Sequence, residues 1–267
     1  MSTTAYTHGY GESVLGSHRH RTVENSAAHL LPHLREGQRL LDVGSGAGTI
    51  TAGLARIVGP HNLVAVEVSD QAADITRTEL RSQGLEAVEV VVADAHDLPF
   101  DPESFDVVHA HQVLQHVADP VAMLGQLRRV TRPGGIVSVR DSDYEAFRWY
   151  PDTPALDRWR ELYLRAARAN GGTPDAGRRL LAWAHQVGFS EVVPSASAQL
   201  YATPEGREAW AGAWAGRITG DPLGTQLVHS GWADEEKLAA LAQAWRDWAQ
   251  DPDAWFTLLH AEILARP

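Results

Sequence analysis

The chain of 267 residues contains no cysteine, one lysine and no long apolar run. Without cysteine it has no disulfide, no thiolate zinc site and no cysteine nucleophile. No apolar stretch approaches the ~20 residues of a membrane-spanning helix, and residues 1–13 lack the apolar core of a signal peptide. We therefore expect a soluble, cytoplasmic protein with no membrane partner.

Positive charge is scarce as well. The formal net charge is −11, and arginine carries nearly all positive charge because Lys237 is the only lysine. Such a preference for arginine is typical of GC-rich genomes, and we expect a bacterial source. Excess negative charge opposes a broad phosphate-binding surface, so we expect no nucleic-acid partner.

Short aliphatic strands alternate with amphipathic helices up to residue 140. Strands are predicted over 39–43, 63–68, 88–93, 105–110 and 136–140, and helices over 21–34, 49–58, 69–83 and 119–130. Alternation of this kind predicts an α/β fold whose ligands bind beyond the carboxyl ends of parallel strands.

The later part of the chain is mainly helical and holds all nine tryptophans, the first of them Trp149. Helices are predicted over 155–169, 175–187, 204–215 and 234–250, and a strand over 191–200. Periodicity alone does not decide the state of residues 255–264.

A glycine-rich turn, Asp42-Val43-Gly44-Ser45-Gly46-Ala47-Gly48, follows the first predicted strand. Glycines let the backbone turn tightly and approach a ligand, and the next helix offers free N–H groups. The pattern is G-x-G-x-G followed by Thr49, which differs from the G-x-G-x-x-G of dinucleotide sites. A plain connection between strand and helix is the alternative.

Acidic residues end the next two strands. Glu67 is placed to accept hydrogen bonds from both hydroxyls of a ribose, and a solvated loop carboxylate is the alternative. Asp94 can accept from an adenine amino group, with Ala95 leaving room for the ring. A helix cap is the alternative for Asp94.

Together these motifs resemble the class I S-adenosylmethionine (SAM)-dependent methyltransferases, in particular the ubiquinone/menaquinone-biosynthesis branch. The resemblance covers about residues 35–141. Besides the glycine turn, Glu67 and Asp94-Ala95, it rests on Leu98-Pro99-Phe100, Ser104-Phe105-Asp106, Leu114-Gln115-His116, Asp119-Pro120 and Arg132-Pro133-Gly134-Gly135.

The resemblance implies a Rossmann-like sheet of seven mostly parallel strands, in the order 3-2-1-4-5-7-6, with helices on both faces and a helical substrate cover. Residues 256–264 become the antiparallel seventh strand. The expected parts are an N-terminal lid and helix (1–34), a SAM-binding core (35–148) and a C-terminal completion of the sheet with the cover (149–267). The lid would carry Tyr6, His8, Tyr10, His18 and Arg19, with a loosely ordered tail as the alternative.

SAM is the cofactor that the resemblance implies. The glycine turn would contact its methionine part and Glu67 its ribose, while His111 would lie near the methyl group. The residues expected to bind SAM are Asp42, Gly44, Ser45, Gly46, Ala47, Gly48, Glu67, Val68, Asp94, Ala95, His111 and Gln112.

Methyl transfer from a sulfonium is an in-line displacement in which positioning can contribute ~7–11 kcal/mol. A base is needed only if the acceptor must lose a proton. The candidate catalytic residues are His111 and Asp141, and further candidate bases are His109, His116 and Tyr144. His111 can act as a base or only form the pocket wall, and we favour the wall. Asp141 is alternatively a structural turn carboxylate.

The three histidines also raise the question of a metal site. His109 and His111 share one strand face, and His116 follows closely. We expect no metal, because the family binds SAM there without one.

We expect methyl transfer to a small, apolar or aromatic acceptor, by a monomer or a homodimer. Trp210 with Trp214, and Trp245 with Trp248, are spaced as neighbours on a helix, which is typical of a core; an aromatic-lined cavity would favour a flat or apolar acceptor. The alternative is a SAM-binding protein of this fold that catalyses a non-methylating step or only binds the cofactor. A nucleotide-dependent oxidoreductase is disfavoured by Thr49 and Asp94-Ala95.

Overall fold

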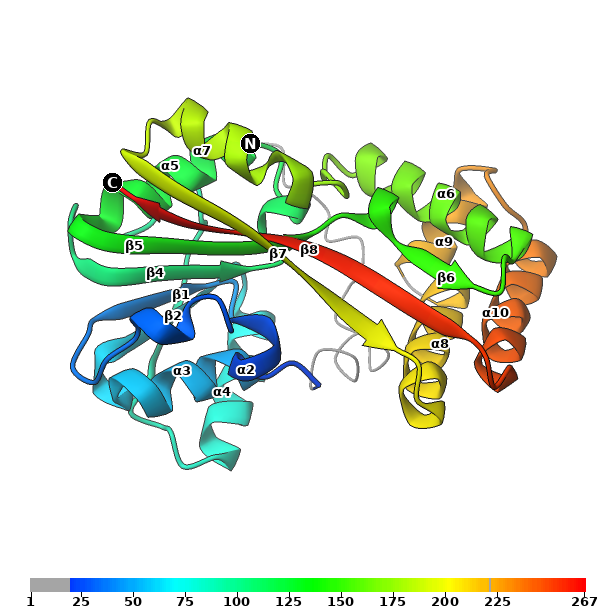
Figure 1. Ribbon diagram of the computed structural model, residues 1–267, viewed down its shortest axis with the longest axis horizontal. Coiled ribbons are helices and arrows are strands. Elements are labelled where there is room, and N and C mark those ends of the chain that lie inside the picture. The colour runs from blue at the N-terminus through cyan, green and yellow to red at the C-terminus, as the bar shows by residue number, and fades with distance from the viewer. Residues whose placement is uncertain (1–19, 221) are drawn as a thin grey trace.

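The computed structural model describes residues 20–220 and 222–267 (Figure 1). The expected lid residues Tyr6, His8, Tyr10, His18 and Arg19 lie outside the described residues. No helix within the described ranges is both long and apolar enough to span a membrane.

Five parallel strands form one side of a mixed sheet, in the order β3-β2-β1-β4-β5, with β3 at the edge. They are β1 (Leu40–Val43), β2 (Leu63–Glu67), β3 (Glu89–Val92), β4 (Phe105–His111) and β5 (Thr131–Ser142). β1, β2 and most of β4 are buried, as expected for parallel strands that carry helices on both faces.

Antiparallel strands complete the sheet. β8 (Trp255–Arg266) pairs with β5, and β7 (Glu191–Tyr201) pairs with the other side of β8. A short strand that was not predicted, β6 (Arg148–Tyr150), also pairs with β8. When β6 is left out and the other strands are numbered in chain order, β7 is the sixth strand and β8 the seventh. The order in the sheet is then the predicted 3-2-1-4-5-7-6. The seventh strand, β8, is antiparallel to both of its neighbours, β5 and β7.

Helices cover both faces of the parallel part (Figure 1). The helices α3 (Thr49–Val58) and α4 (Asp70–Ser82) pack on one face with the short helix α2 (Val23–Ser26). On the other face lie α5 (Pro120–Val130) and α7 (Leu180–Val187). Side chains alternate along β4, so Val107 belongs to the first core and Val108 to the second.

Capping residues set the starts of two helices. The Ser69 hydroxyl accepts from Ala72 N at 3.3 Å at the start of α4, and the Asp119 carboxylate accepts from Ala122 N at 2.9 Å at the start of α5. Each contact satisfies one of the N–H groups that a helix start leaves unpaired.

The predicted continuous helix over 21–34 is wrong. Helix α2 covers only Val23–Ser26, and a 3-10 turn, η1, covers Leu31–His33. Pro32 explains the break, because it has no N–H and its ring would clash with the carbonyl of residue 28 in a continuous helix. The helix predicted over 175–187 is also divided in the structure, into the 3-10 turn η5 (Gly177–Arg179) and the helix α7.

The second half builds a separate aromatic core around the far ends of β7 and β8. It is formed by α6 (Pro154–Ala169), α8 (Pro204–Thr219), α10 (Glu235–Gln250) and α9 (Leu223–His229), the last of which was not predicted (Figure 1).

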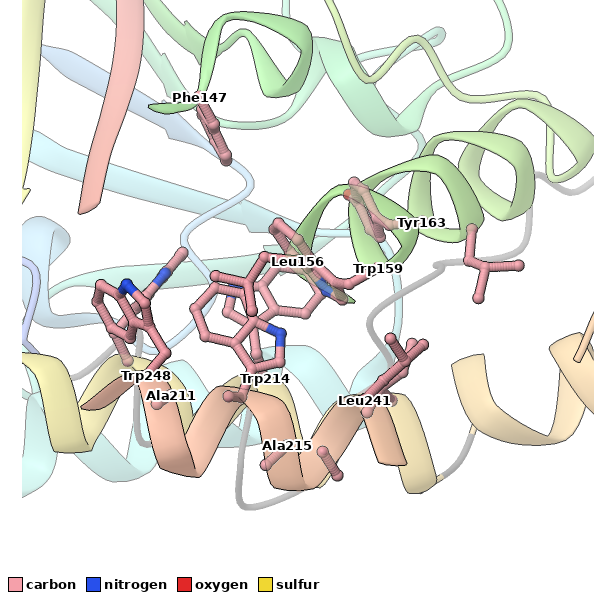
Figure 2. Close-up of a cluster of buried hydrophobic side chains, with 14 of the residues drawn as sticks. Phe147, Leu156, Trp159, Tyr163, Ala211, Trp214, Ala215, Leu241 and Trp248 are labelled. Atoms are coloured by element: carbon pink, nitrogen blue, oxygen red, sulfur yellow. The ribbon is translucent and has the colours of Figure 1, made fainter. Parts of the chain in front are cut away.

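Tryptophans fill this core by packing on one another (Figure 2). Trp159 contacts Trp214 and Trp245 edge to face, with ring centroids 4.5 and 4.8 Å apart, and all three are fully buried. The predicted neighbours on the helices, Trp210 with Trp214 and Trp245 with Trp248, also lie in the core, and the ring centroids of Trp210 and Trp214 are 5.9 Å apart. The prediction that these tryptophans belong to a core is therefore confirmed.

Candidate active site

The glycine-rich turn connects β1 to α3 in the left-handed region of backbone conformation. Gly44, Gly46 and Gly48 have φ values of 77°, 55° and 80°. A Cβ on Gly44 would lie 2.4 Å from a methyl carbon of Val113, whereas one on Gly46 would meet only the Gly44 carbonyl, at 4.0 Å. Gly44 is thus required by packing, and Gly46 leaves open space in which a ligand can approach the backbone.

Glu67, at the end of β2, is bonded to this turn. Its Oε1 accepts from Gly46 N at 2.5 Å and its Oε2 from Val68 N at 3.1 Å. Burial raises the pKa of this carboxyl. Each oxygen keeps a further lone pair, so the carboxylate can still accept from the hydroxyls of a ribose. The next side chain, Val68, is 65% exposed and gives an apolar surface suited to an adenine ring.

Asp94 follows β3 and caps the next turn. Its carboxylate accepts from His96 N and contacts His96 Nδ1, both at 2.9 Å, and these hydrogen bonds lower its pKa. The side chain is largely exposed. Asp94 therefore makes a capping contact, as in the alternative prediction, and its carboxylate also remains accessible to the amino group of a ligand.

Other residues of the motif face the protein. Asp42 Oδ2 accepts from the Thr51 hydroxyl at 2.6 Å, and Asp42 Oδ1 lies 2.7 Å from His109 Nδ1. The Ser45 hydroxyl lies 2.9 Å from that of Thr76. These buried contacts hold the turn against α3, α4 and β4.

His111 ends β4 on the sheet face that carries α3. It is only 6% exposed, yet neither ring nitrogen has a hydrogen-bond partner among residues 20–220 and 222–267. Burial, with the charges of Arg21 and Arg140, holds the pKa of His111 well below its usual value. The ring is therefore neutral near pH 7 and offers one donor and one acceptor nitrogen to a ligand.

Asp141 caps a turn. Its carboxylate accepts from Leu114 N at 3.2 Å and Gln115 N at 3.3 Å, at the start of the 3-10 turn η3 (Leu114–His116). Burial raises its pKa to about 7 in spite of these bonds. The contacts favour the structural role that the sequence left as an alternative.

Of the remaining candidate bases, two are neutral. Burial lowers the pKa of His116 to about 3 and raises that of Tyr144, which lies in the 3-10 turn η4 (Tyr144–Ala146). The charge of Arg21 acts on both groups, so both lie within electrostatic reach of that guanidinium.

Comparison with known proteins places the chain in a family. A family model described as a methyltransferase domain matches residues 41–139. An uncharacterized methyltransferase of Schizosaccharomyces pombe is 30% identical over 276 residues, which cover 97% of this chain and 95% of the relative. The chain belongs to the SAM-dependent methyltransferases. Its cofactor is accordingly SAM.

Two further similarities concern the branch and the fold. A ubiquinone/menaquinone biosynthesis C-methyltransferase of Vibrio parahaemolyticus is 38% identical over 103 residues, 38% of this methyltransferase and 40% of the relative. A solved [4+2]-cyclase has a TM-score of 0.51 at 23% identity, over 98% of this chain and 87% of its own. The predicted resemblance and fold class are confirmed.

Two residues that the sequence analysis missed lie beside His111 in the methyltransferase. Arg21 Nη2 donates to Gln112 Oε1 at 2.8 Å, and Gln112 Nε2 lies 2.7 Å from His260 Nε2. The His260 ring stacks on that of His111, with centroids 6.2 Å apart. The one available signal was a histidine in the apolar run Phe256–Leu264.

The geometry brings the glycine turn, Glu67 and His111 to one edge of the sheet and leaves Asp141 capping a turn. Within residues 20–220 and 222–267, no group of three or more histidines and carboxylates is arranged to hold a metal ion. His109 is bonded to Asp42 and is not paired with His111.

Proposed function

We propose that this methyltransferase transfers the methyl group of SAM to a small molecule with an apolar or aromatic body. The observation that carries the proposal is the buried imidazole of His111 at the carboxyl end of β4, where ligands bind in sheets of this kind. Neither of its ring nitrogens has a hydrogen-bond partner within the described part of the chain. The tryptophans fill their own core, as their helical spacing predicted, so we do not assign the acceptor surface to them.

The cofactor fits the residues at this edge. We assign the methionine part to the backbone from Gly44 to Gly48, because the space beside Gly46 is open. Glu67 would accept from the ribose hydroxyls, and Val68 with Ala95 would border the adenine. Asp94 would accept from the adenine amino group.

The acceptor would lie between His111 and the aromatic core of the cover. Tyr144 and Tyr201 belong to or pack against that core, and the charge of Arg21 acts on both hydroxyls as well as on His111. Arg21 is bonded to Gln112, the residue that follows His111, so we place the acceptor beside this guanidinium. An apolar body against the tyrosines and a polar group toward His111 suits this arrangement.

SAM supplies an activated methyl group on a good leaving sulfur. The protein's task is then to hold the acceptor atom in line and to exclude water. A neutral His111 orients the acceptor without placing a second positive charge beside the sulfonium. Membership of the methyltransferase family favours methyl transfer over the non-methylating alternative.

We also propose the division of the chain into a lid and helix (1–34), a SAM-binding core (35–148) and a cover region (149–267). The formal charge of −11 supports a small acceptor over a nucleic acid. The cytoplasmic location, bacterial source and homodimer stay predictions from the sequence.

The test combines calorimetry with turnover. SAM and S-adenosylhomocysteine should bind the purified protein, and a panel of phenolic, quinone-type and aliphatic acceptors should yield S-adenosylhomocysteine and a product heavier by one methylene. Binding without product from any acceptor would support the non-methylating alternative. Methylation of RNA or DNA in preference to the panel would contradict the small-molecule assignment.

A further inference from the structure

Three residues far apart in the sequence form a hydrogen-bonded chain that ends beside His111. Arg21 donates to the Gln112 side-chain oxygen, and the Gln112 side-chain nitrogen contacts His260 Nε2, at 2.8 and 2.7 Å. His260 is fully buried in the middle of β8, and its ring plane lies 29° from that of His111. These hydrogen bonds connect Arg21, which precedes the cap residue of α2, to β8, the strand shared by both halves of the molecule.

Arg21 fixes the direction of this chain. A guanidinium only donates, so Gln112 must present Oε1 to Arg21 and its NH₂ group to His260. His260 Nε2 then accepts, and a neutral His260 carries its proton on Nδ1. A proton on Nε2 would set two donors against each other, so the same contacts oppose a charged His260.

Gln112 is held in an unusual conformation for this contact. Its φ of 55° lies in the left-handed region that residues other than glycine rarely adopt. Its backbone N–H donates to the Arg140 carbonyl at 2.7 Å, and both ends of its side chain are bonded. A strained residue fixed by its surroundings on several sides is typical of a functional position.

The surroundings keep both imidazoles uncharged. Arg21 and Arg140 act on both imidazoles, and His260 and His109 also act on His111. Arg140 is itself paired with Glu262 at 3.1 Å. Burial and the two arginines hold the pKa of His260 well below its usual value, as for His111, while the Leu258 carbonyl opposes the shift. Buried nitrogens are costly unless they are hydrogen-bonded. Those of His111 have no partner among the residues that the structure describes, which points to a ligand.

We propose that His111, beside a His260 that Arg21 and Gln112 lock in its neutral form, is the subsite for an uncharged hydroxyl group of the acceptor, such as a phenol or an enol. The two nitrogens of a neutral imidazole point in different directions, one as a donor and one as an acceptor, and a hydroxyl can pair with whichever of them faces it, since it both donates and accepts. A carboxylate can pair only with the donor nitrogen, and an ammonium can pair only with the acceptor nitrogen and would face the nearby arginines. This inference rests on the proposed function, because it takes the acceptor to lie at His111.

Nitrogen NMR of the full chain with ¹⁵N-labelled histidine and bound S-adenosylhomocysteine tests the subsite. Phenol is the probe, and benzoate and benzylamine are its charged counterparts. The variants His111→Gln and His260→Gln assign the signals, and His61→Gln is a surface control. We expect His260 in the Nδ1–H form across neutral pH, and we expect phenol, but neither charged analogue, to shift the His111 signals.

The variant Gln112→Glu tests the lock. A carboxylate can accept from both Arg21 and His260, so His260 should move its proton to Nε2 or become charged, and the phenol response of His111 should fall. A wild-type His260 in the Nε2–H form, or a His111 that phenol does not shift, would overturn the subsite. Failure of S-adenosylhomocysteine to bind the wild type would instead contradict the proposed function.

Discussion

At the scale of single residues, Glu67 has two tasks that experiment can separate. Its carboxylate holds the glycine turn through Gly46 N and Val68 N, and we assign the ribose to the same oxygens. Hydrogen bonds to a charged group contribute about 1.5–3 kcal/mol each. We expect Glu67→Ala to weaken binding of S-adenosylhomocysteine by about 10- to 100-fold or more, measured by calorimetry.

An analogue lacking both ribose hydroxyls provides the control for Glu67. The wild type should lose affinity for the analogue, whereas Glu67→Ala should bind the analogue and the parent compound about equally. If the folded variant still prefers the parent compound as strongly as the wild type does, the ribose assignment is wrong.

Asp141 makes the stability of the protein depend on pH in a direction opposite to that of a paired surface carboxylate. Burial raises its pKa to about 7, above the ordinary value near ~3.9 of an unfolded chain. Between these values the folded protein holds a proton that the unfolded chain has released, so this contribution to stability falls as pH rises and levels off above the folded pKa.

The variant Asp141→Asn lacks this titration. From pH 5 to 7, the free energy of unfolding of the wild type minus that of the variant should fall by up to about 1.4 kcal/mol per pH unit. Denaturant unfolding at several pH values measures the difference. A difference that stays constant or grows with pH would show that Asp141 is ionised throughout.

At the scale of elements, the turn between β1 and α3 has a strained backbone at Gly46 and is also where we place the cofactor. Gly84 has the same strain away from this turn, so substitutions at the two glycines separate the effect of strain from the effect of ligand contact. Gly46 and Gly84 have φ values of 55° and 70°, and a Cβ at either position meets no atom closer than 4.0 Å. Alanine at either site should cost about 1–2 kcal/mol of stability. Only Gly46→Ala should also weaken S-adenosylhomocysteine binding, by at least about tenfold, since its methyl group enters the cofactor space.

Thermal unfolding and calorimetry on this pair of variants distinguish the two effects. Wild-type affinity in both variants would remove the cofactor from the turn. An equal loss of affinity in Gly46→Ala and Gly84→Ala would point to a general effect of the strained backbone.

Elements with strong local signals were predictable from the sequence. The helix α3 has the predicted bounds, and α4 and α5 begin within one residue of the predicted starts at 69 and 119. The predicted helix over 21–34 is wrong because the spacing of its hydrophobic residues does not take account of Pro32, which interrupts a helix. The helix α9 is short and its start follows Pro222, so its local pattern was weak.

The site divides in the same way. Glu67 and the glycine turn lie at the ends of recognisable strands, and their proximity follows from the parallel sheet. The place of His260 is not predictable in this way, because it depends on the register of β8 on β5, in which His260 lies opposite Ser142. The resemblance implied that these two strands pair, but the sequence does not reveal their register, so a contact across it stayed hidden.

At the scale of the whole molecule, β8 belongs to every hydrophobic core. Phe256 and Leu258 lie in the aromatic core, Ile263 and Ala265 in the core with α5 and α7, and Leu264 packs against the core with α3. Elements that share a strand in this way should unfold together. The two halves of the chain are therefore expected to behave as one cooperative unit.

The tryptophan distribution allows a direct test. All nine tryptophans lie at or after Trp149, so their fluorescence reports on the second half, whereas far-ultraviolet circular dichroism reports on the whole chain. The two melting curves should coincide, and S-adenosylhomocysteine, bound at the other half, should raise both midpoints equally. A fluorescence transition that ignores the ligand would show that the cover region unfolds on its own.

The position of β8 also sets the order in which the chain can fold as it leaves the ribosome. Every other strand of the sheet is synthesised earlier, yet β7 has only β8 as a described neighbour. Until residues 255–266 emerge, β7 has no edge to join, and its row of backbone groups is open to other chains. The five parallel strands can form first. The edge strand β7 must wait until β8 inserts between it and β5, so chaperone binding during synthesis should concentrate on the segment from 191 to 201.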